Sequence, residues 1–375
     1  MKSNFLSDKS NTGFYVFLLY HNRMVTPHNI YIHVPFCASK CNYCAFFSRA
    51  CATPNWDAYA DGIIREIQYW AEILGHINVP TVFFGGGTPS LMPVGIFQKI
   101  MNALRSAFNL DSRCEITLES NPGTIDATKL DEFIQSGVTR ISIGVQSFDD
   151  EKLKFLGRRH NAATARKFLD LAMARGVRVS ADFIYGLPGE DVRDVVQLCR
   201  DINSIGVPHC SLYELSIEAG TPFATMNLQM PTNDEMANMY NAISDNLNIP
   251  RYEVSNYATP GNECLHNLYI WDGAPYIGIG RGAAGRVLVD GAWYEQLGAG
   301  AGLKKISNEI RAIERVITGM RTIRGVALDT DTKKVINMDY VNSHPDLLRC
   351  TSDNRISATR NGMLILDNVI CDMIK

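Results

Sequence analysis

In Cys37-Ala38-Ser39-Lys40-Cys41-Asn42-Tyr43-Cys44, three thiols stand at spacings of four and three residues. Thiolates are soft ligands that suit iron–sulfur clusters or zinc. A four-iron cluster held by three cysteines keeps one iron open, and that iron can bind a small molecule through an amine and a carboxylate. The alternative is a zinc knuckle that takes its fourth ligand from Cys51 or His33. The spacing alone leaves both interpretations open.

The composition is that of an ordinary globular protein. The chain has 375 residues, of which 46% are hydrophobic and 20% charged, with a formal charge of −3 and a pI near 6.3. Neither the charge nor any basic run indicates nucleic acid as a partner. Seven of the ten cysteines are scattered outside the segment above. This usage is typical of a reducing compartment and predicts a cytoplasmic protein.

Residues 1–28 are expected to be an extension of the fold. The run Phe14–Tyr20 is apolar but far too short to span a bilayer. A signal peptide is disfavoured because no small-residue cleavage site follows this run. We expect either a packed extension or translation that begins at Met24.

Short β-rich runs then alternate with amphipathic stretches, which predicts an α/β protein with parallel strands and helices packed outside. The expected strands are Ile30–Val34, Thr81–Phe84, Glu115–Glu119, Arg140–Val145, Arg178–Tyr185 and Cys210–Leu215. The expected helices are Asp57–Leu74, Val94–Phe108, Ala162–Arg175 and Asp191–Ile205. Six such units without a seventh or eighth predict a partial (β/α)6 barrel over residues 29–231, with its chemistry at the strand carboxyl ends.

Residues 232–375 are expected to form a smaller α+β domain that closes the open side of the barrel. The pattern predicts a helix over Thr232–Leu247 and a strand over Arg251–Tyr257, followed by a Gly-rich stretch. A helix is expected around Asn308–Met320, and short alternating pieces at Arg355–Thr359 and Met363–Asp367.

Polar residues gather where the predicted barrel strands end. The run Gly85-Gly86-Gly87-Thr88-Pro89 lets the backbone approach a ligand closely. Glu119, Gln146 and Asp182 lie at or near the ends of later strands, and Arg158 can pair with a carboxylate. Each of these residues alone has a plain alternative: a polar side chain satisfied by the protein itself, or, for Arg158, a solvated charge at a helix end. Together they predict a polar ring that holds ribose hydroxyls and a charged amino acid.

A resemblance to known proteins rests on four motifs. These are Tyr31-Ile32-His33-Val34-Pro35-Phe36-Cys37, Gly85-Gly86-Gly87-Thr88-Pro89, Ile141-Ser142-Ile143-Gly144-Val145-Gln146-Ser147-Phe148 and Ile184-Tyr185-Gly186-Leu187-Pro188-Gly189. With the cysteine spacing, the chain from about Asn29 onward resembles the oxygen-independent coproporphyrinogen III oxidase family of radical S-adenosylmethionine (SAM) proteins. The resemblance implies a [4Fe–4S] cluster held by Cys37, Cys41 and Cys44. The residues that it implies for SAM are Tyr31, Tyr43, Gly86, Gly87, Thr88, Glu119, Gln146, Arg158 and Asp182.

Within this family the chain looks most like the heme-chaperone branch. The oxidases carry a further cysteine two residues past the third, where this chain has Phe46, and they are longer. The resemblance therefore implies a protein that binds heme and transfers it to an acceptor protein. The alternative is an enzyme that decarboxylates coproporphyrinogen III to protoporphyrinogen IX by radical chemistry. Peripheral membrane association and the oligomeric state are left open.

The heme-chaperone branch also implies a heme site at His266-Asn267-Leu268-Tyr269-Ile270-Trp271. A neutral imidazole of His266 can ligate heme iron, and Trp271 can stack on the porphyrin. Ile270 departs from the tyrosine usual in that branch, and Gly282-Ala283-Ala284-Gly285 replaces its Gly-Ala-His-Gly. The alternative is a hydrogen-bonded structural histidine.

Overall fold

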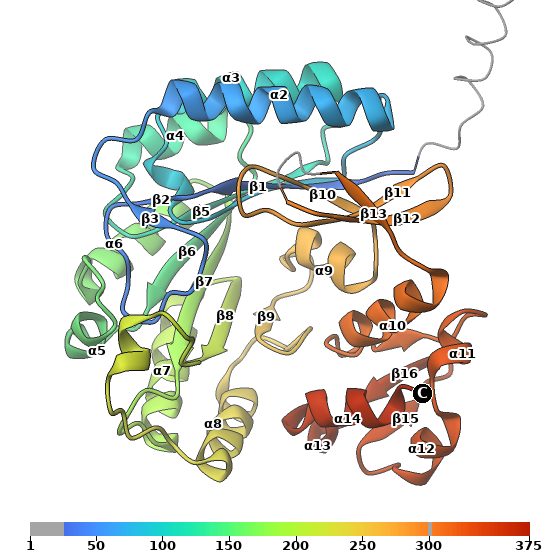
Figure 1. The fold of residues 1–375 in the computed structure, drawn as a ribbon. Coiled ribbons are helices and arrows are strands. Elements are labelled where there is room, and N and C mark those ends of the chain that lie inside the picture. Colours follow the sequence, from blue (N-terminus) through green and yellow to red (C-terminus); the bar gives the residue numbers. More distant parts are fainter. Residues whose placement is uncertain (1–25, 299–301) are drawn as a thin grey trace, which may run out of the picture.

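The computed structural model describes residues 26–298 and 302–375, so the expectations for the chain before Thr26, a start at Met24 among them, lie outside the described residues. The described part is organised around one curved sheet of eleven strands (Figure 1). Six parallel strands follow in chain order: β1 (Asn29–Val34), β4 (Thr81–Gly86), β5 (Glu115–Ser120), β6 (Arg140–Gln146), β7 (Arg178–Tyr185) and β8 (His209–Glu214). The partial barrel predicted from the sequence is confirmed.

Amphipathic helices connect these strands and cover the outer face of the sheet. They are α2 (Trp56–Leu74), α3 (Val94–Ala107), α4 (Ala127–Gln135), α5 (Asp150–Phe155), α6 (Ala162–Met173) and α7 (Val192–Ile205). Figure 1 shows α2 and α3 together outside β1 and β10. In α2, Ile63, Ile67 and Trp70 recur on one buried face, and the Asn55 side chain accepts from the Ala58 backbone N–H at the start of the helix. The sequence analysis did not anticipate α4 and α5, which are short.

The two faces of the sheet differ in polarity. In β6, Ile141 and Ile143 belong to the main hydrophobic core. Arg140 and Ser142 alternate with them and line a cavity on the inner face. Parallel sheets are commonly covered by apolar packing on both faces. A polar inner face therefore indicates a chamber built to hold a ligand.

The chain after residue 231 extends the same sheet at both edges. Beside β8 lies β9 (Asn256–Ala258), which is antiparallel, and beside β1 lies β10 (Tyr276–Ile279), which is parallel. The edge beyond β10 continues with β11 (Gly285–Val289), β12 (Ala292–Gln296) and β13 (Leu303–Lys305). The helix α8 (Asn233–Asn246) precedes β9, and α9 (Leu265–Trp271) lies between β9 and β10 in the chain and on the inner side of the sheet (Figure 1). A domain boundary at 231/232 stays a prediction, since the sheet continues across it.

A second hydrophobic core holds the last segment together, and it includes Val316, Ile356 and Val369. Its elements are α10 (Asn308–Gly319), β14 (Val326–Ala327), α11 (Thr332–Val335), α12 (Met338–Ser343), β15 (Leu348–Cys350), β16 (Arg355–Ala358), α13 (Arg360–Leu364) and α14 (Leu366–Met373). Among the described residues, no helix has the length and apolar character needed to cross a membrane.

In this half, one expected alternating piece and one expected strand differ from the structure. Met363–Asp367 lies in α13 and α14, because Leu366, Val369 and Ile370 bury one helical face against the second core. Of Arg251–Tyr257, only the last two residues belong to a strand, β9. The residues before it turn back instead, with the Ser255 backbone N–H donating to the buried carboxylate of Glu253.

Candidate functional site

One cavity of about 610 Å³ occupies the inner face of the barrel and reaches the strand carboxyl ends. Its wall includes every residue predicted from the sequence to hold a cluster or SAM, and His266 of the expected heme site, but not Trp271. These residues come from segments as far apart in the chain as β1 and α9. The fold therefore brings the predicted cluster and SAM residues and His266 to one chamber.

The cysteine loop is fixed at both ends and in its middle. Cys37 ends the short strand β2 (Phe36–Cys37), which pairs with β3 (Arg49–Ala50) beyond the loop. Between them, the Asn42 side-chain amide donates to the Phe155 carbonyl at 2.7 Å, at the end of α5. The loop is therefore held by the β2–β3 pairing and by its contact with α5.

The three thiols line the cavity together, and the zinc alternative gains no support from the described residues. Within residues 26–298 and 302–375, no group of three His, Cys, Asp or Glu side chains lies close enough to bind a single ion. Zinc needs its ligands around one centre, whereas each cysteine of a cluster meets a different iron. His33 has no nitrogen left for zinc: Nε2 donates to the Phe47 carbonyl at 2.7 Å, and Nδ1 accepts from the Tyr31 hydroxyl at 3.0 Å.

Arg158 lies inside the site and is not a solvated charge. Its Nη1 is 3.4 Å from the Cys41 sulfur, while Nη2 donates to the Asn121 side chain at 2.5 Å and to the Gly144 carbonyl at 2.6 Å. A guanidinium beside thiolate sulfurs compensates their negative charge. Arg158 therefore belongs with the cluster loop.

The glycine run lies against the cluster loop, as its position after β4 predicts. A Cβ on Gly87 would meet the Phe36 carbonyl oxygen at 2.7 Å and the Cys37 sulfur at 2.9 Å. This close approach therefore needs a residue without a side chain at position 87. Burial also raises the pKa of the Cys37 thiol, and hydrogen bonds from Thr88 and Ser48 oppose that rise.

Two carboxyl groups, those of Glu119 and Asp182, lie in the polar ring. Glu119 accepts from the Gly86 backbone N–H at 2.9 Å, and burial, with the charge of Asp182, raises its pKa to about 8. The Asp182 carboxylate accepts from three serine hydroxyls, at 2.8 to 3.0 Å. These are Ser142, Ser180 and Ser211. A cationic ligand beside Glu119 would favour the ionised form of its carboxyl group.

Gln146 stands in a strained conformation at the end of β6. Its φ is 68°, in the left-handed region, and the pairing with β7 shifts register between Gly144 and Gln146. Its amide lines the cavity, and within the described part of the chain no hydrogen bond from it to the protein is present. Bulges and strained residues re-aim side chains at binding sites.

The structure defines which nitrogen of His266 is free. The Asn29 amide donates to the Pro275 carbonyl, so its oxygen faces Thr81, whose hydroxyl donates to that oxygen at 2.8 Å. The Thr81 oxygen then accepts from His266 Nδ1 at 2.7 Å. The proton therefore lies on Nδ1, and Nε2 keeps a bare lone pair. This Nε2 atom is buried without a partner among the described residues.

Burial lowers the pKa of His266 to about 4, so the ring is neutral near pH 7. Its backbone is fixed by Glu115, the first residue of β5. The Glu115 carboxylate accepts from the backbone N–H groups of Leu265 and His266 at 3.1 and 3.0 Å, where α9 begins. Trp271 is not part of the cavity wall, and the Arg321 guanidinium lies 5.7 Å from its ring centroid. The expected stacking of Trp271 on a porphyrin therefore gains no support.

Several residues of the site were missed by sequence reasoning. They include Thr81, Asn121, Arg140, Ser142 and Ser211. The available signal was the alternation of polar with apolar residues in the strands, as in Arg140-Ile141-Ser142-Ile143. That alternation marks the inner face of the sheet before any partner is known.

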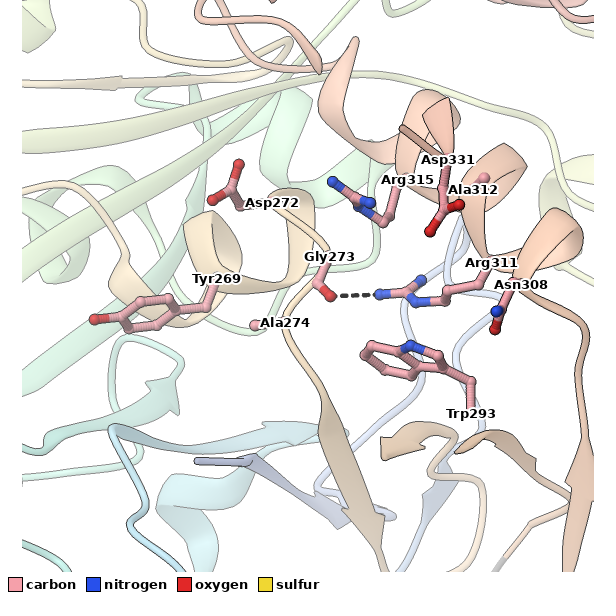
Figure 2. A pocket seen from close by; sticks show the side chains of 10 residues that line it. All are labelled: Tyr269, Asp272, Gly273, Ala274, Trp293, Asn308, Arg311, Ala312, Arg315 and Asp331. Atoms are coloured by element: carbon pink, nitrogen blue, oxygen red, sulfur yellow. Dashed lines mark hydrogen bonds between the residues drawn. The ribbon is translucent and has the colours of Figure 1, made fainter. Parts of the chain in front are cut away.

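A second cavity, of about 410 Å³, lies between α9 and α10 (Figure 2). Its arginines already have partners. Arg311 donates to the Gly273 carbonyl and to Glu314 and lies over the Trp293 ring, while Arg315 pairs with Asp329. None of the cysteines of the first cavity lines this one. The contacts around it, such as that of Arg311 with the Gly273 carbonyl, join the last segment to the end of α9.

Comparison with known proteins agrees with the interpretation of the inner cavity as a site for a cluster and SAM. A sequence model of the radical SAM superfamily matches residues 31–202. The heme chaperone HemW of Escherichia coli is 37% identical over 267 residues, which cover 70% of this chain and 70% of that protein. The heme chaperone HemW of Lactococcus lactis is 32% identical over 323 residues, 81% of this chain and 84% of the relative.

Among solved structures, the chain resembles the coproporphyrinogen III oxidase HemN from Escherichia coli, a radical SAM enzyme. The TM-score is 0.76 over 95% of this chain and 92% of that one, at 19% identity, so this likeness shows the fold alone. Membership of the radical SAM superfamily implies a [4Fe–4S] cluster and SAM, which the three thiols and the polar ring fit. From its sequence relatives and its fold, the chain belongs to the HemW family of the radical SAM superfamily.

Proposed function

We propose that the protein is a heme chaperone, which binds heme in the inner cavity and transfers it to an acceptor protein. The observation that carries the proposal is the bare Nε2 of His266, a buried lone pair in the same cavity as the cysteine loop. A neutral imidazole nitrogen whose other nitrogen is fixed by a hydrogen bond is the usual protein ligand of heme iron. The HemW relatives are named heme chaperones, which supports the same function.

The residues of the cavity divide into two groups. Cys37, Cys41 and Cys44 would hold a [4Fe–4S] cluster, which supplies an open iron for the amine and carboxylate of SAM. The remaining SAM contacts would come from the polar ring, where Glu119 offers a carboxyl group to a cation and Gln146 offers an amide that has no hydrogen-bond partner among the described residues. In this function the cluster and SAM support heme binding or release rather than turnover.

A heme titration of the cluster-loaded protein tests the axial ligand. His266→Ala should lose the low-spin Soret shift that the unaltered protein shows. The matched control is His209→Gln: His209 is also buried on the inner face, but its nitrogens are engaged by Ser180 and Tyr252 at 2.8 Å each. We expect the control to keep the shift. Retention of the low-spin spectrum in His266→Ala, in protein with an unchanged circular dichroism spectrum, refutes the assignment.

An anaerobic turnover assay separates the chaperone from the oxidase alternative. The cluster-loaded protein is incubated with coproporphyrinogen III, SAM and a reductant, and the products are analysed by mass spectrometry. We expect no porphyrin product, because the position of the oxidases' further cysteine is taken by Phe46. Protoporphyrinogen IX and 5′-deoxyadenosine appearing together would make the protein an oxidase.

A further inference from the structure

Arg140 is a buried cation on the inner face of the barrel. It is the first residue of β6, and its side chain lines the cavity opposite the outer core packing of Ile141. Only 2% of the residue is exposed. An arginine stays charged at any physiological pH, so its burial requires compensation from hydrogen-bond acceptors.

The protein supplies no acceptor for this guanidinium in the part of the chain that the structure describes. The Nε atom of Arg140 is buried without a partner, and no hydrogen bond or ion pair joins the rest of the group to any described residue. Other buried or half-buried arginines behave differently. Arg178 pairs with Glu115 at 2.5 Å. Arg311, whose Nε is also buried without a partner among the described residues, donates through its two Nη atoms to Glu314 and to the Gly273 carbonyl.

Two carboxylates near Arg140 are already engaged. Glu115 accepts from Arg178 and from the backbone N–H groups at the start of α9. Asp182 accepts from three serine hydroxyls. Both exert electrostatic attraction on Arg140 without a hydrogen bond to it. Buried donors in folded proteins nearly always have a partner, so an open guanidinium in a cavity wall calls for an acceptor from a ligand.

The acceptor that suits a guanidinium best is a carboxylate, which meets its paired N–H groups with two oxygens. Arg140 shares the cavity with His266, and the charge of Arg140 adds to burial in lowering the pKa of that histidine, so the two lie within electrostatic reach. A ligand whose iron binds His266 Nε2 and whose carboxylate accepts from the Arg140 guanidinium would give both residues a partner. Heme is such a ligand, because it bears two propionates.

We infer that Arg140 binds a propionate carboxylate of the heme in this cavity. The inference rests on the proposed function and adds a second anchor to it, at the amino end of β6. SAM also carries a carboxylate, but the open iron of the cluster would take that group at the cysteine loop. Arg140 is then a recognition residue for the acid groups of the porphyrin.

The test compares hemin with hemin dimethyl ester, in which both propionates are neutral esters. Cluster-loaded protein is titrated with each compound, and SAM binding is measured in parallel by equilibrium dialysis. The unaltered protein should prefer hemin to the ester by roughly 10- to 100-fold, the range of a hydrogen bond to a charged group. Arg140→Gln should bind hemin weaker by a similar factor, bind the ester unchanged and keep its SAM affinity.

Arg193→Gln is the control, because it makes the same change of charge at an exposed arginine whose side chain is 91% accessible. It should leave both affinities unaltered. If Arg140→Gln does not fold, Arg140→Lys keeps the charge without the paired donors and should show a reduced preference for hemin.

Equal binding of hemin and its ester by the unaltered protein would overturn the inference and leave the heme chaperone standing. A preference for hemin that survives in Arg140→Gln, together with lost SAM affinity, would also overturn it, since the carboxylate would then be that of SAM. Binding of neither porphyrin by cluster-loaded protein would defeat the proposed function itself.

Discussion

The Oγ1 atom of Thr81 stands 2.7 Å from the Nδ1 atom of His266, although the two residues are 185 positions apart in the chain. Thr81 begins β4 and His266 lies in α9, so the contact joins the barrel to the segment that extends it. The Thr81 hydroxyl has one proton, which goes to Asn29, and it can only accept from the histidine. A strand residue thereby determines the protonation of a helix residue.

Thr81→Val should weaken heme binding by roughly tenfold or more, the usual effect of removing the hydrogen bond that orients a ligating histidine. Without the hydroxyl, the proton of His266 can move to Nε2 and the ring can turn. Soret titration measures the change. Thr117→Val is the control, because the Thr117 hydroxyl is buried without a partner within the described residues and loses nothing. Equal heme affinities of the two variants would show that Thr81 does not set the tautomer.

The raised pKa of Glu119 predicts a pH-dependent stability of the SAM-free protein. The folded chain keeps the Glu119 proton up to about pH 8, whereas the unfolded chain loses it near its ordinary value of 4.5. The unfolded state therefore binds fewer protons in this window, and stability falls as the pH rises through it. Glu119→Gln removes this titration. As the pH rises from about 5 to 8, the Tm of the variant should therefore increase by roughly 2–8 °C relative to the Tm of the unaltered protein.

Differential scanning calorimetry over this pH range provides the measurement. Glu151→Gln, at an exposed position on α5, is the control and should follow the unaltered protein at every pH. Parallel curves for Glu119→Gln and the unaltered protein would mean that the carboxyl group titrates at its ordinary value and that burial does not hold its proton.

Much of the barrel was predictable because its signals are local. Ile63, Ile67 and Trp70 recur at helical spacing, and the helix they predict is α2. The strand Arg178–Tyr185 was predicted with the bounds that it has. Residues that end strands, such as Glu119 and Gln146, share a cavity because parallel strands place their carboxyl ends together.

What the sequence could not reveal depends on distant partners. Met363–Asp367 alternates like a strand, but the second core buries it as helix. The pairing of β10 with β1 joins residues about 250 positions apart, for which no local pattern exists. The tautomer of His266 and the missing partner of Arg140 are likewise properties of side chains that meet only in the folded barrel.

Cys41→Ala should abolish the thiolate-to-iron charge-transfer absorbance of the reconstituted protein, because the loop then offers too few thiolates for the cluster. Absorbance and iron content per chain measure the loss. Cys371→Ala is the matched control, since Cys371 is an exposed free cysteine at the far end of the chain, and it should retain full iron. An unchanged absorbance in Cys41→Ala would refute its assignment as a cluster ligand.

Gly87→Ala should disturb the cluster loop without touching a ligand. The new methyl group would lie 2.7 Å from the Phe36 carbonyl oxygen and 2.9 Å from the Cys37 sulfur, so the end of β2 must move. We expect a loss of about 1–3 kcal/mol of stability, as for other overpacked sites, and a lower iron content after reconstitution.

The control for this change is Gly95→Ala, in the first turn of α3, where the added Cβ meets nothing within 4 Å. Alanine there should stabilise the helix by about 0.5–1 kcal/mol, so the same substitution acts with opposite sign at the two glycines. Thermal unfolding gives the stabilities, and iron analysis gives the cluster content. Full iron and unchanged stability in Gly87→Ala would mean that the loop can retreat from the glycine run, and that the close approach at Gly87 is not what places Cys37.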